Sequence, residues 1–373
     1  MTLLSINAGS SSLKVAVFDD SSLEVPKNSI NIEQVTSFED ATVKVSSWLL
    51  DDLSISPSEI TAIGYRVVHG GEIFNAPTLI SESVIESLTD LTLLAPNHMP
   101  ATLATIAAFQ AAYPNVPHVA CFDTSFFHDL PKKAVVLPID YQLQKKHGIR
   151  RFGFHGLSYE SLLNNFRQHE GEEAAKGRVI MAHLGSGASM TVCVDGRPID
   201  TTMGFTPVSG IMMSTRSGDI EPGVLTFLQK QANMSAEEIA ELVTHRSGLL
   251  GVSGTSAEMY SLLQTQEENP DVALAVELFC DKIKKQLGAF AAIAGGVDSI
   301  IFTGGIGERS AEIRARVLSG LDFMGIALDD ERNARGDRLI SVDGAKVGIH
   351  VIPAREESSI ARETLARVKQ GAS

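Results

Sequence analysis

The chain has 373 residues, 44% of them hydrophobic and 20% charged, a length that suits two or three domains. Its 31 basic and 45 acidic residues give a net charge of −14, which argues against nucleic-acid or anionic-membrane partners because these require a basic face. Three widely spaced cysteines predict neither a disulfide framework nor a cysteine-rich metal site. The opening MTLLSINAGSSSLK lacks the pattern of a signal peptide, and no apolar run approaches membrane-spanning length. We therefore expect a cytoplasmic globular protein.

Short apolar stretches alternate with segments of helical periodicity along the chain. The apolar stretches predict β-strands over 2–6, 13–18, 60–68, 117–122, 178–184, 190–195, 299–303 and 349–352. Apolar residues spaced three and four apart predict helices over roughly 79–93, 101–113, 155–168, 222–232, 236–244, 270–294 and 357–370. Strands that alternate with helices are typical of the α/β class.

One unit of local structure occurs twice. INAGSSSLKVAVFD at 6–19 and VIMAHLGSGASMTVCVD at 179–195 both predict a strand, a turn of small residues and a second strand. A third glycine turn at 304–308 follows the strand predicted over 299–303, and we expect a helix from about residue 309. An internal duplication constrains the whole architecture, so two halves of similar fold are expected.

The three glycine turns are suited to binding phosphate. With little or no side chain in the way, backbone N–H groups can approach phosphate oxygens closely. A single turn of this kind is more often an ordinary hairpin, but three of them in a duplicated frame favour phosphate binding. The chain has no Gly-Lys dipeptide for a P-loop, and Ser310 stands where the dinucleotide fingerprint needs its third glycine. A P-loop NTPase and an ordinary Rossmann dehydrogenase are therefore not favoured.

Family-specific strings are distributed from end to end of the chain. They are INAGSSSLK at 6–14, RVVHGG at 66–71, FDTSF at 122–126, RRFGFHG at 150–156, HLGSGAS at 183–189, MGFTP at 203–207, MMSTRSGDIEPG at 212–223, FTGGIGE at 302–308 and VIPAREE at 351–357. In these strings the chain resembles the acetate/propionate kinase family. The resemblance implies the actin and sugar-kinase fold, an α/β protein of two duplicated ribonuclease-H-like domains with an active-site cleft between them. Residues 1–140 with 358–373 would form the carboxylate-binding domain, which carries the N-terminal phosphate hairpin, and 141–357 the nucleotide-binding domain.

The resemblance also implies a reaction. ATP would transfer its terminal phosphoryl group directly and in line to acetate, or to a similar acid such as propionate, giving an acyl phosphate and ADP, and the reaction would be reversible. The implied cofactor is Mg²⁺, or Mn²⁺ in its place, and the implied assembly is a homodimer. The physiological direction depends on metabolite levels, which the sequence does not contain.

Five residues match the catalytic set of the family: Asp123, Arg216, His155, Arg66 and His98. Arg66 would hold the carboxylate substrate and Arg216 the oxygens of the phosphoryl group, since the planar guanidinium pairs with either anion and stays charged. His155 would stabilise the transition state, and Asp123 would orient metal-bound water and substrate. The alternatives are a helix cap for Asp123 and an ordinary core or surface imidazole for each histidine.

The resemblance assigns the metal to Asn7 and Glu356, whose side chains offer the oxygen ligands that Mg²⁺ prefers. It assigns the carboxylate pocket to Arg66, Val68, Asn97, Phe154 and Pro207. Asn97 departs from the family, which has a leucine there. Because an apolar pocket distinguishes one methylene by only about 1–3 kcal/mol, acetate and propionate remain alternatives.

The nucleotide and phosphate site implied by the resemblance consists of Ser10, Ser12, Lys14, His183, Leu184, Gly185, Ser186, Gly187, Glu258, Met259, Tyr260, Gly304, Gly305, Ile306, Gly307 and Glu308. Three positions depart from the family on this side: Ser186 and Arg309 replace asparagines, and Tyr260 replaces an arginine. Neutral drift explains them if Tyr260 stacks on a base and Ser186 still donates a hydrogen bond. Another donor such as pyrophosphate is the alternative, and a non-catalytic nucleotide-binding member of the superfamily is a second one.

Overall fold

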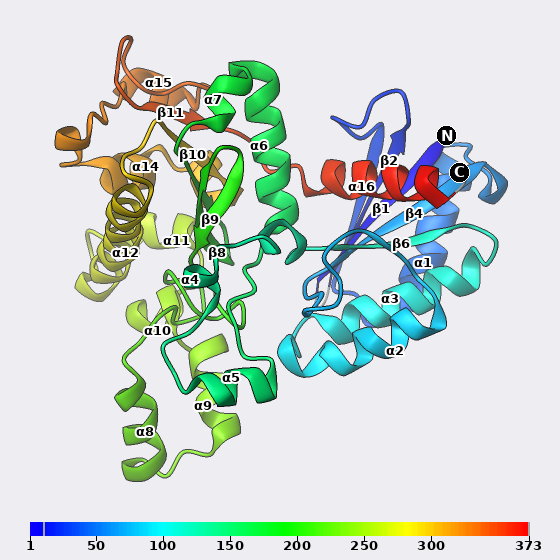
Figure 1. Cartoon of the computed structure of the whole chain (residues 1–373), viewed down its shortest axis with the longest axis horizontal. Helices are drawn as coiled ribbons and strands as arrows, with labels where there is room; N and C mark the ends of the chain where they lie inside the picture. The colour runs from blue at the N-terminus through cyan, green and yellow to red at the C-terminus, as the bar shows by residue number, and fades with distance from the viewer. Residues whose placement is uncertain (10–11, 372–373) are drawn as a thin grey trace. The chain divides into compact units, whose positions relative to one another are not determined.

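The computed structural model describes residues 1–9 and 12–371, so Ser10 of the predicted phosphate hairpin lies outside the described residues. The chain forms two compact units (Figure 1). Unit 1 consists of Met1–His128, Phe154–Ser161 and Arg355–Ser373. Unit 2 consists of Asp129–Gly153 and Leu162–Ala354.

Unit 1 is a mixed sheet with helices. Its strands are β1 (Thr2–Ala8), β2 (Ser12–Asp19), β3 (Asn28–Glu33), β4 (Ile60–Val67), β5 (Thr78–Leu79) and β6 (His118–Phe122). Its helices are α1 (Phe38–Ser47), α2 (Glu82–Asp90), α3 (Met99–Ala112) and α16 (Glu356–Gly371), and α6 (Gly156–Glu170) begins in this unit and ends in unit 2. Short 3-10 or π-helical segments lie at Trp48–Asp52, Pro57–Glu59, Leu91–Leu94 and Ser125–Phe127.

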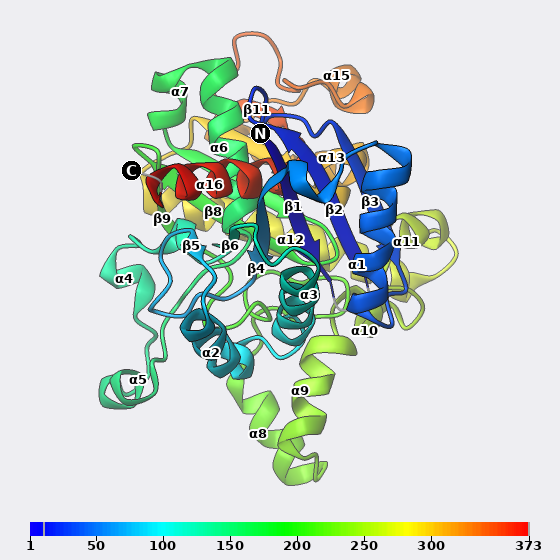
Figure 2. The ribbon, with the colours of Figure 1, turned by 90° about the vertical axis from the view of Figure 1, so that its right-hand side faces the viewer.

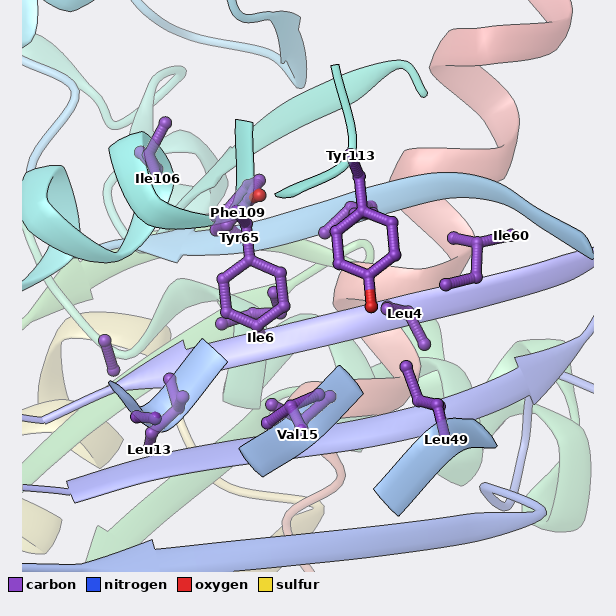
Figure 3. Close-up of a cluster of buried hydrophobic side chains, with 14 of the residues drawn as sticks. Leu4, Ile6, Leu13, Val15, Leu49, Ile60, Tyr65, Ile106, Phe109 and Tyr113 are labelled. Atoms are coloured by element: carbon purple, nitrogen blue, oxygen red, sulfur yellow. The ribbon is translucent and has the colours of Figure 1, made fainter. Parts of the chain in front are cut away.

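The strands of unit 1 are ordered β3-β2-β1-β4-β6-β5. β1 pairs antiparallel with β2 and parallel with β4, and β4 pairs parallel with β6. Successive side chains of a strand point to opposite faces, so Leu3 and Leu4 enter different clusters. Leu4 belongs to the cluster drawn in Figure 3, which also contains Tyr65 and Phe109, whereas Leu3 packs with Ala361 of α16. The sheet is thus covered on both faces, which leaves its strand ends and loops to carry polar groups.

Unit 2 contains a second sheet made of β7 (Val179–Leu184), β8 (Ala188–Val194), β9 (Arg197–Thr201), β10 (Ser299–Thr303) and β11 (Gly348–Val351). Its helices, which Figure 2 shows from a second direction, are α4 (Lys132–Val135), α5 (Tyr141–His147), α7 (Glu172–Lys176), α8 (Pro222–Gln231), α9 (Ala236–His245), α10 (Gly248–Ser253), α11 (Met259–Thr265), α12 (Pro270–Ala294), α13 (Gly304–Arg309), α14 (Ala311–Leu318) and α15 (Asp330–Arg335). A further 3-10 turn lies at Asp322–Met324.

The two sheets confirm the predicted duplication. The order in unit 2, β11-β10-β7-β8-β9, repeats the order β6-β4-β1-β2-β3 of unit 1. In each case a hairpin forms the first two strands of the sheet, a third antiparallel strand follows on its outer side, and two parallel strands are added on the other side. The expected mixed α/β fold with two related halves is therefore present.

One expectation about local structure was wrong. The third glycine segment was expected to be a turn over 304–308 with a helix from about residue 309, but helix α13 already begins at Gly304. Gly304 has a φ of +76°, a conformation that glycine adopts without strain, and the next helix starts at Ala311. In the described part of the chain, no helix is both long and apolar enough to cross a membrane.

Candidate active site

Three polar residues lie at the carboxyl ends of neighbouring parallel strands in unit 1. Asn7 is near the end of β1, Arg66 near the end of β4, and Asp123 directly follows β6. The register pairs Ile6 with Tyr65, and the Asp123 amide donates to the Val67 carbonyl at 3.0 Å, so these strand ends are level. Ligands of open α/β sheets commonly bind at this edge, which makes the group a candidate site.

Arg66 and Asp123 form the central ion pair of this group. Nε and Nη2 of Arg66 donate to the same oxygen of Asp123, Oδ2, at 3.0 and 2.7 Å. Nη1 lies 3.3 Å from Oε2 of Glu356 and 3.4 Å from Oδ1 of Asn7, and Nδ2 of Asn7 donates to Glu356 at 3.1 Å. One cation therefore faces two carboxylates and an amide oxygen. The structure thus brings two of the predicted catalytic residues, Arg66 and Asp123, together with the predicted metal ligands Asn7 and Glu356.

Burial and charge act in opposite directions on this pair. Burial lowers the pKa of Arg66, but the carboxylates of Asp123 and Glu356 outweigh it, so its pKa is raised and the guanidinium stays charged. Burial raises the pKa of Asp123, and the nearby charge of Arg66 offsets this only in part. Replacing Arg66 would thus leave a desolvated carboxylate without its main partner.

The donor set suits a hard divalent cation. Oδ1 of Asp123 is buried and accepts no hydrogen bond from any residue within 1–9 or 12–371. Together with Glu356 and Asn7 it supplies oxygen ligands, and Mg²⁺ typically takes one or two carboxylates and fills the other positions with phosphate and water. Among the described residues no cluster of three or more His, Cys, Asp or Glu side chains could hold a metal by itself. This set therefore fits a metal that arrives with a phosphate ligand.

His155 is held in an unusual backbone conformation beside this group. Its φ is +61°, a left-handed value that is uncommon outside glycine and concentrates at functional sites. The next residue, Gly156, donates its amide to the carbonyl of Asp123 at 2.9 Å, and a Cβ there would lie 2.1 Å from that oxygen. Only glycine permits this approach. The last glycine of the string Gly-Phe-His-Gly, Gly156, is therefore required for steric reasons.

The predicted carboxylate-pocket residues of unit 1 differ in exposure. Val68 and Phe154 are buried, and the Phe154 ring packs edge to face on His69 with centroids 5.4 Å apart. His98 is half-buried immediately before α3, and Asn97 beside it is exposed. The fifth member, Pro207, belongs to unit 2, where its carbonyl accepts a hydrogen bond from Arg216.

Gly9 and Ser12, at the two ends of the first glycine turn, lie close together. The Gly9 amide donates to the Ser12 carbonyl at 2.8 Å, and a Cβ on Gly9 would lie 2.6 Å from the Ser12 hydroxyl. Lys14, predicted as a cation for phosphate, pairs with Glu357 at 2.5 Å through its Nζ. Sequence reasoning missed Glu357 because it lies in α16, far from the hairpin along the chain.

In unit 2 the second and third glycine segments touch each other. Gly304 packs against the end of β7 so closely that a Cβ would lie 2.7 Å from the Leu184 carbonyl. Strands β7 and β10 are parallel neighbours, with His183 paired to Thr303, so both glycine segments leave the sheet at the same edge. The backbone thus presents two small-residue segments side by side.

A pocket of about 580 Å³ in unit 2 contains much of the predicted nucleotide site. Its lining includes the predicted residues Gly185, Ser186, Glu258, Met259, Tyr260, Gly305 and Ile306. It also includes Arg309, noted above as a departure from the family, and Ser214, Ala257, Leu263, Gln264, Ser310, Ala311 and Glu312, which had not been predicted. The Tyr260 side chain is 76% exposed, so its ring offers a face to a ligand. The residues missed come mainly from α11 and α14, where no motif marked them.

Arg216 lies in a folded loop that is fixed to the second glycine turn. The Ser214 amide donates to the Ser186 carbonyl at 3.2 Å. Nη1 of Arg216 donates to the Pro207 carbonyl at 3.0 Å. Gly248 supports the loop, because a Cβ there would lie 2.2 Å from the carbonyl of Met213. The position of Arg216 is therefore tied to the glycine pocket within unit 2.

Together these features define a class of protein: a duplicated α/β fold with an arginine–carboxylate group on one unit and a glycine-lined pocket on the other. Comparison with known proteins narrows the class. A model of the acetokinase family matches residues 25–362. An acetate kinase of Clostridium botulinum is 39% identical, with 99% of this chain and 100% of that protein covered.

Two solved structures agree with this result. The acetate kinase of Porphyromonas gingivalis has a TM-score of 0.88 at 35% identity, over 98% of this chain and 99% of the other. A propionate kinase from Francisella tularensis has a TM-score of 0.89 at 32% identity, with the same coverage. The chain belongs to the acetokinase family.

Proposed function

We propose that the protein is an acetate kinase, which transfers the γ-phosphoryl group of ATP to acetate and gives acetyl phosphate and ADP, with propionate as a second acceptor. In this reaction a carboxylate oxygen of the acid attacks the γ-phosphorus. The bond between that phosphorus and the oxygen that leaves with ADP breaks. The observation that carries the proposal is the group Asn7, Arg66, Asp123 and Glu356 at level strand ends in a member of this family. Such a group suits a small anion that must approach a phosphate.

On unit 1, Arg66 is proposed to bind the carboxylate substrate. Its guanidinium is held charged by Asp123 and Glu356, and Nη1 is the nitrogen not engaged by Asp123. Val68 and Phe154 would contact the methyl group of the acid. His155 is proposed to donate a hydrogen bond to the phosphoryl group, in a backbone conformation that Gly156 secures against Asp123. His98 and Asn97 are proposed to line the same pocket.

Mg²⁺ is proposed as the cofactor, with Mn²⁺ able to take its place. Asn7 and Glu356 would hold the ion, and Asp123 would orient its bound water and the substrate. When bound, it supplies positive charge to the donor's phosphates. Two like-charged reactants repel each other, and phosphoryl transfer is catalysed mainly by positioning and by neutralising the transferred group. Arg66 and Arg216 would contribute the remaining charge from the chain itself.

On unit 2, the glycine-lined pocket is proposed to bind ATP. Backbone amides of Gly187, Gly305 and Ile306 would face the phosphates, and Tyr260 would stack on the base. Arg216 would hold the oxygens of the transferred group. The loop that carries Arg216 is fixed to the second glycine turn, because the Ser214 amide donates to the Ser186 carbonyl. This contact supports a position of Arg216 close to that turn. On this unit His183, Leu184, Ser186, Glu258, Met259, Gly304 and Gly307 stay assigned to the donor site. On unit 1, Ser12 and Lys14 stay assigned to phosphate binding by the first glycine turn.

The donor and the acceptor are tested together by trapping the product. The full chain is incubated with Mg²⁺, acetate or propionate, hydroxylamine, and either ATP or pyrophosphate. Acyl hydroxamate is expected with ATP and with both acids, and none with pyrophosphate. Hydroxamate with pyrophosphate alone would overturn the proposed donor, and its absence in every mixture would overturn the reaction.

A homodimer is the assembly we propose. It is supported by helices α8 and α9 of unit 2, in which no residue is buried within the single chain. Phe227 on α8 is 62% exposed and Val224 is 44% exposed. Light scattering of the full chain is expected to give twice the monomer mass of 39.9 kDa, and Phe227→Asp is expected to reduce it. A monomeric wild-type protein would contradict this assignment.

A further inference from the structure

Glu308 is the last residue of the third glycine segment, and its side chain folds back onto that segment. The residue is near the end of the six-residue helix α13, yet its carboxylate reaches back to the beginning of that helix. Oε1 accepts hydrogen bonds from the Thr303 hydroxyl at 3.2 Å and from the Gly304 amide at 3.0 Å. The same oxygen accepts a third hydrogen bond, from the Ala354 amide at 3.0 Å. One carboxylate oxygen thus ties two separate segments of unit 2 together.

The charges at the two ends of α13 match the needs of a helix. A carboxylate at the first turn satisfies an amide that has no partner within the helix. At the other end Arg314, which is 1% exposed, donates to the carbonyls of Gly307 and Glu308 at 2.8 and 2.9 Å. Its other nitrogens donate to Asn333. The glycine segment is therefore clamped from both ends by buried or half-buried charged side chains.

The third contact links this segment to the end of β11. Ala354 is the last residue of unit 2 along the chain, and only Arg355 separates it from Glu356, the proposed metal ligand. Fixing the Ala354 amide therefore leaves a very short length of chain before Glu356. The amide that Glu308 holds therefore lies two residues before Glu356 along the chain.

We propose that Glu308 is a positioning residue for phosphoryl transfer: it holds the donor's glycine segment and the Ala354 backbone together, and it does not contact the nucleotide. This rests on the proposed function, in which Gly305 and Ile306 face phosphate and Glu356 faces the metal. A carboxylate aimed at polyphosphate would repel it. In contrast, an oxygen that already accepts three hydrogen bonds within unit 2 is suited to holding backbone in place.

The test compares Glu308→Ala and Glu308→Gln, with Glu331→Gln on α15 as the control because Glu331 is exposed. Glu308→Ala is expected to reduce kcat/KM for ATP by about 10–100-fold, the usual effect of removing a group that orients ligands from behind. The Mg²⁺ concentration for half-maximal rate should rise, while KM for acetate stays unchanged. Glu308→Gln keeps an acceptor oxygen and should restore most of the rate. Kinetics of Glu308→Ala equal to those of Glu331→Gln, or a Gln variant as impaired as the Ala variant, would overturn the proposal.

A second measurement does not depend on activity. Hydrogen–deuterium exchange of the full chain should be faster in Glu308→Ala than in wild type for peptides that contain Gly304 and Ala354, and unchanged for peptides from β7. Unchanged exchange at both amides would overturn the proposal that Glu308 holds the two segments together, even if kcat/KM for ATP fell. If the wild type is inactive, the proposed function fails while this readout still decides the positioning role. If Glu308→Ala does not fold, Thr303→Val removes one donor and should raise the KM for ATP; an unaltered KM would contradict the proposal.

Discussion

At the scale of single residues, Arg66 is the group on which the proposed chemistry depends most. Its charge is maintained by two carboxylates, and its fork geometry lets it bind Asp123 while Nη1 faces Asn7 and Glu356. A point charge without that geometry could not replace it fully. The identity of the residue and its partners therefore matter more than the net charge at this position.

Arg66→Ala is expected to reduce kcat/KM for acetate by about 10²–10³-fold, a typical loss for one charged donor in an active site. Arg66→Lys should recover only part of this, because an ammonium lacks the planar fork. Steady-state kinetics with acetate as the varied substrate provide the measurement, with Arg335→Ala on α15 as the exposed control. A wild-type KM and kcat in Arg66→Ala would remove Arg66 from the acceptor site.

Some contacts of single residues could not be predicted from the sequence. Motif strings named Asn7, Arg66, Asp123 and Glu356, and these residues do lie together. The partner of Lys14 is Glu357, however, and the carboxylate of Glu308 turns back onto its own segment. The Lys14–Glu357 pair joins two segments that are far apart in the sequence. The Glu308 contact depends on a helix that begins at Gly304, where the glycines had indicated a turn.

At the scale of elements, glycines allow backbone segments to approach where phosphate is expected. Gly304 combines a φ of +76° with a backbone neighbour, Leu184, so close that no side chain fits. The wrong expectation about this segment has the same origin. Glycines suggested a turn, but here the first of them begins helix α13, because the Glu308 carboxylate caps its first amide.

Gly304→Ala is expected to destabilise unit 2 and to impair donor binding. The new Cβ would lie 2.7 Å from the Leu184 carbonyl, in a backbone conformation that is unfavourable for alanine. A conformational strain of about 1–3 kcal/mol is typical, and the displaced backbone should raise the KM for ATP. Urea unfolding and donor kinetics test this, with Gly336→Ala as the comparison: it has a similar φ of +68° but open space around it. Equal effects on the KM for ATP would contradict the packing argument.

Strand β11 carries a buried histidine whose titration should be visible in stability. Burial lowers the pKa of His350 to about 4, with opposing contributions from Glu170 and Arg338. Between about pH 4 and its ordinary value of 6.5 the unfolded chain therefore binds more protons at this position than the folded one. Stability must fall as the pH drops through that window, by about 1.4 kcal/mol per pH unit from this residue.

His350→Gln should remove this part of the pH dependence. The free energy of unfolding in urea is measured at several pH values from 4 to 7 for wild type, His350→Gln and the exposed control His147→Gln. The slope of stability against pH should become shallower in His350→Gln and stay unchanged in His147→Gln. An identical slope in all three proteins would show that His350 does not titrate as its burial requires.

At the scale of the whole molecule, the duplication was the most informative feature of the sequence. The two strand–turn–strand units of the sequence lie in two different sheets, which have the same strand order. The long helix expected over 270–294 is α12. Short elements such as β3, β5 and β9 were missed, because a few residues at a sheet edge carry little periodicity. Fold and family could thus be predicted, whereas pocket lining from α11 and α14 required the structure.

The central claim is that a carboxylate oxygen accepts the phosphoryl group of ATP. It is tested most directly by ³¹P NMR of a reaction with ¹⁸O-labelled acetate, Mg²⁺, ATP and the full chain. The account predicts loss of the γ-phosphate signal and a new acyl phosphate signal with the isotope shift of one ¹⁸O bound to phosphorus. Release of unlabelled inorganic phosphate and ADP without an acyl phosphate signal would show that water is the acceptor, and would contradict the account.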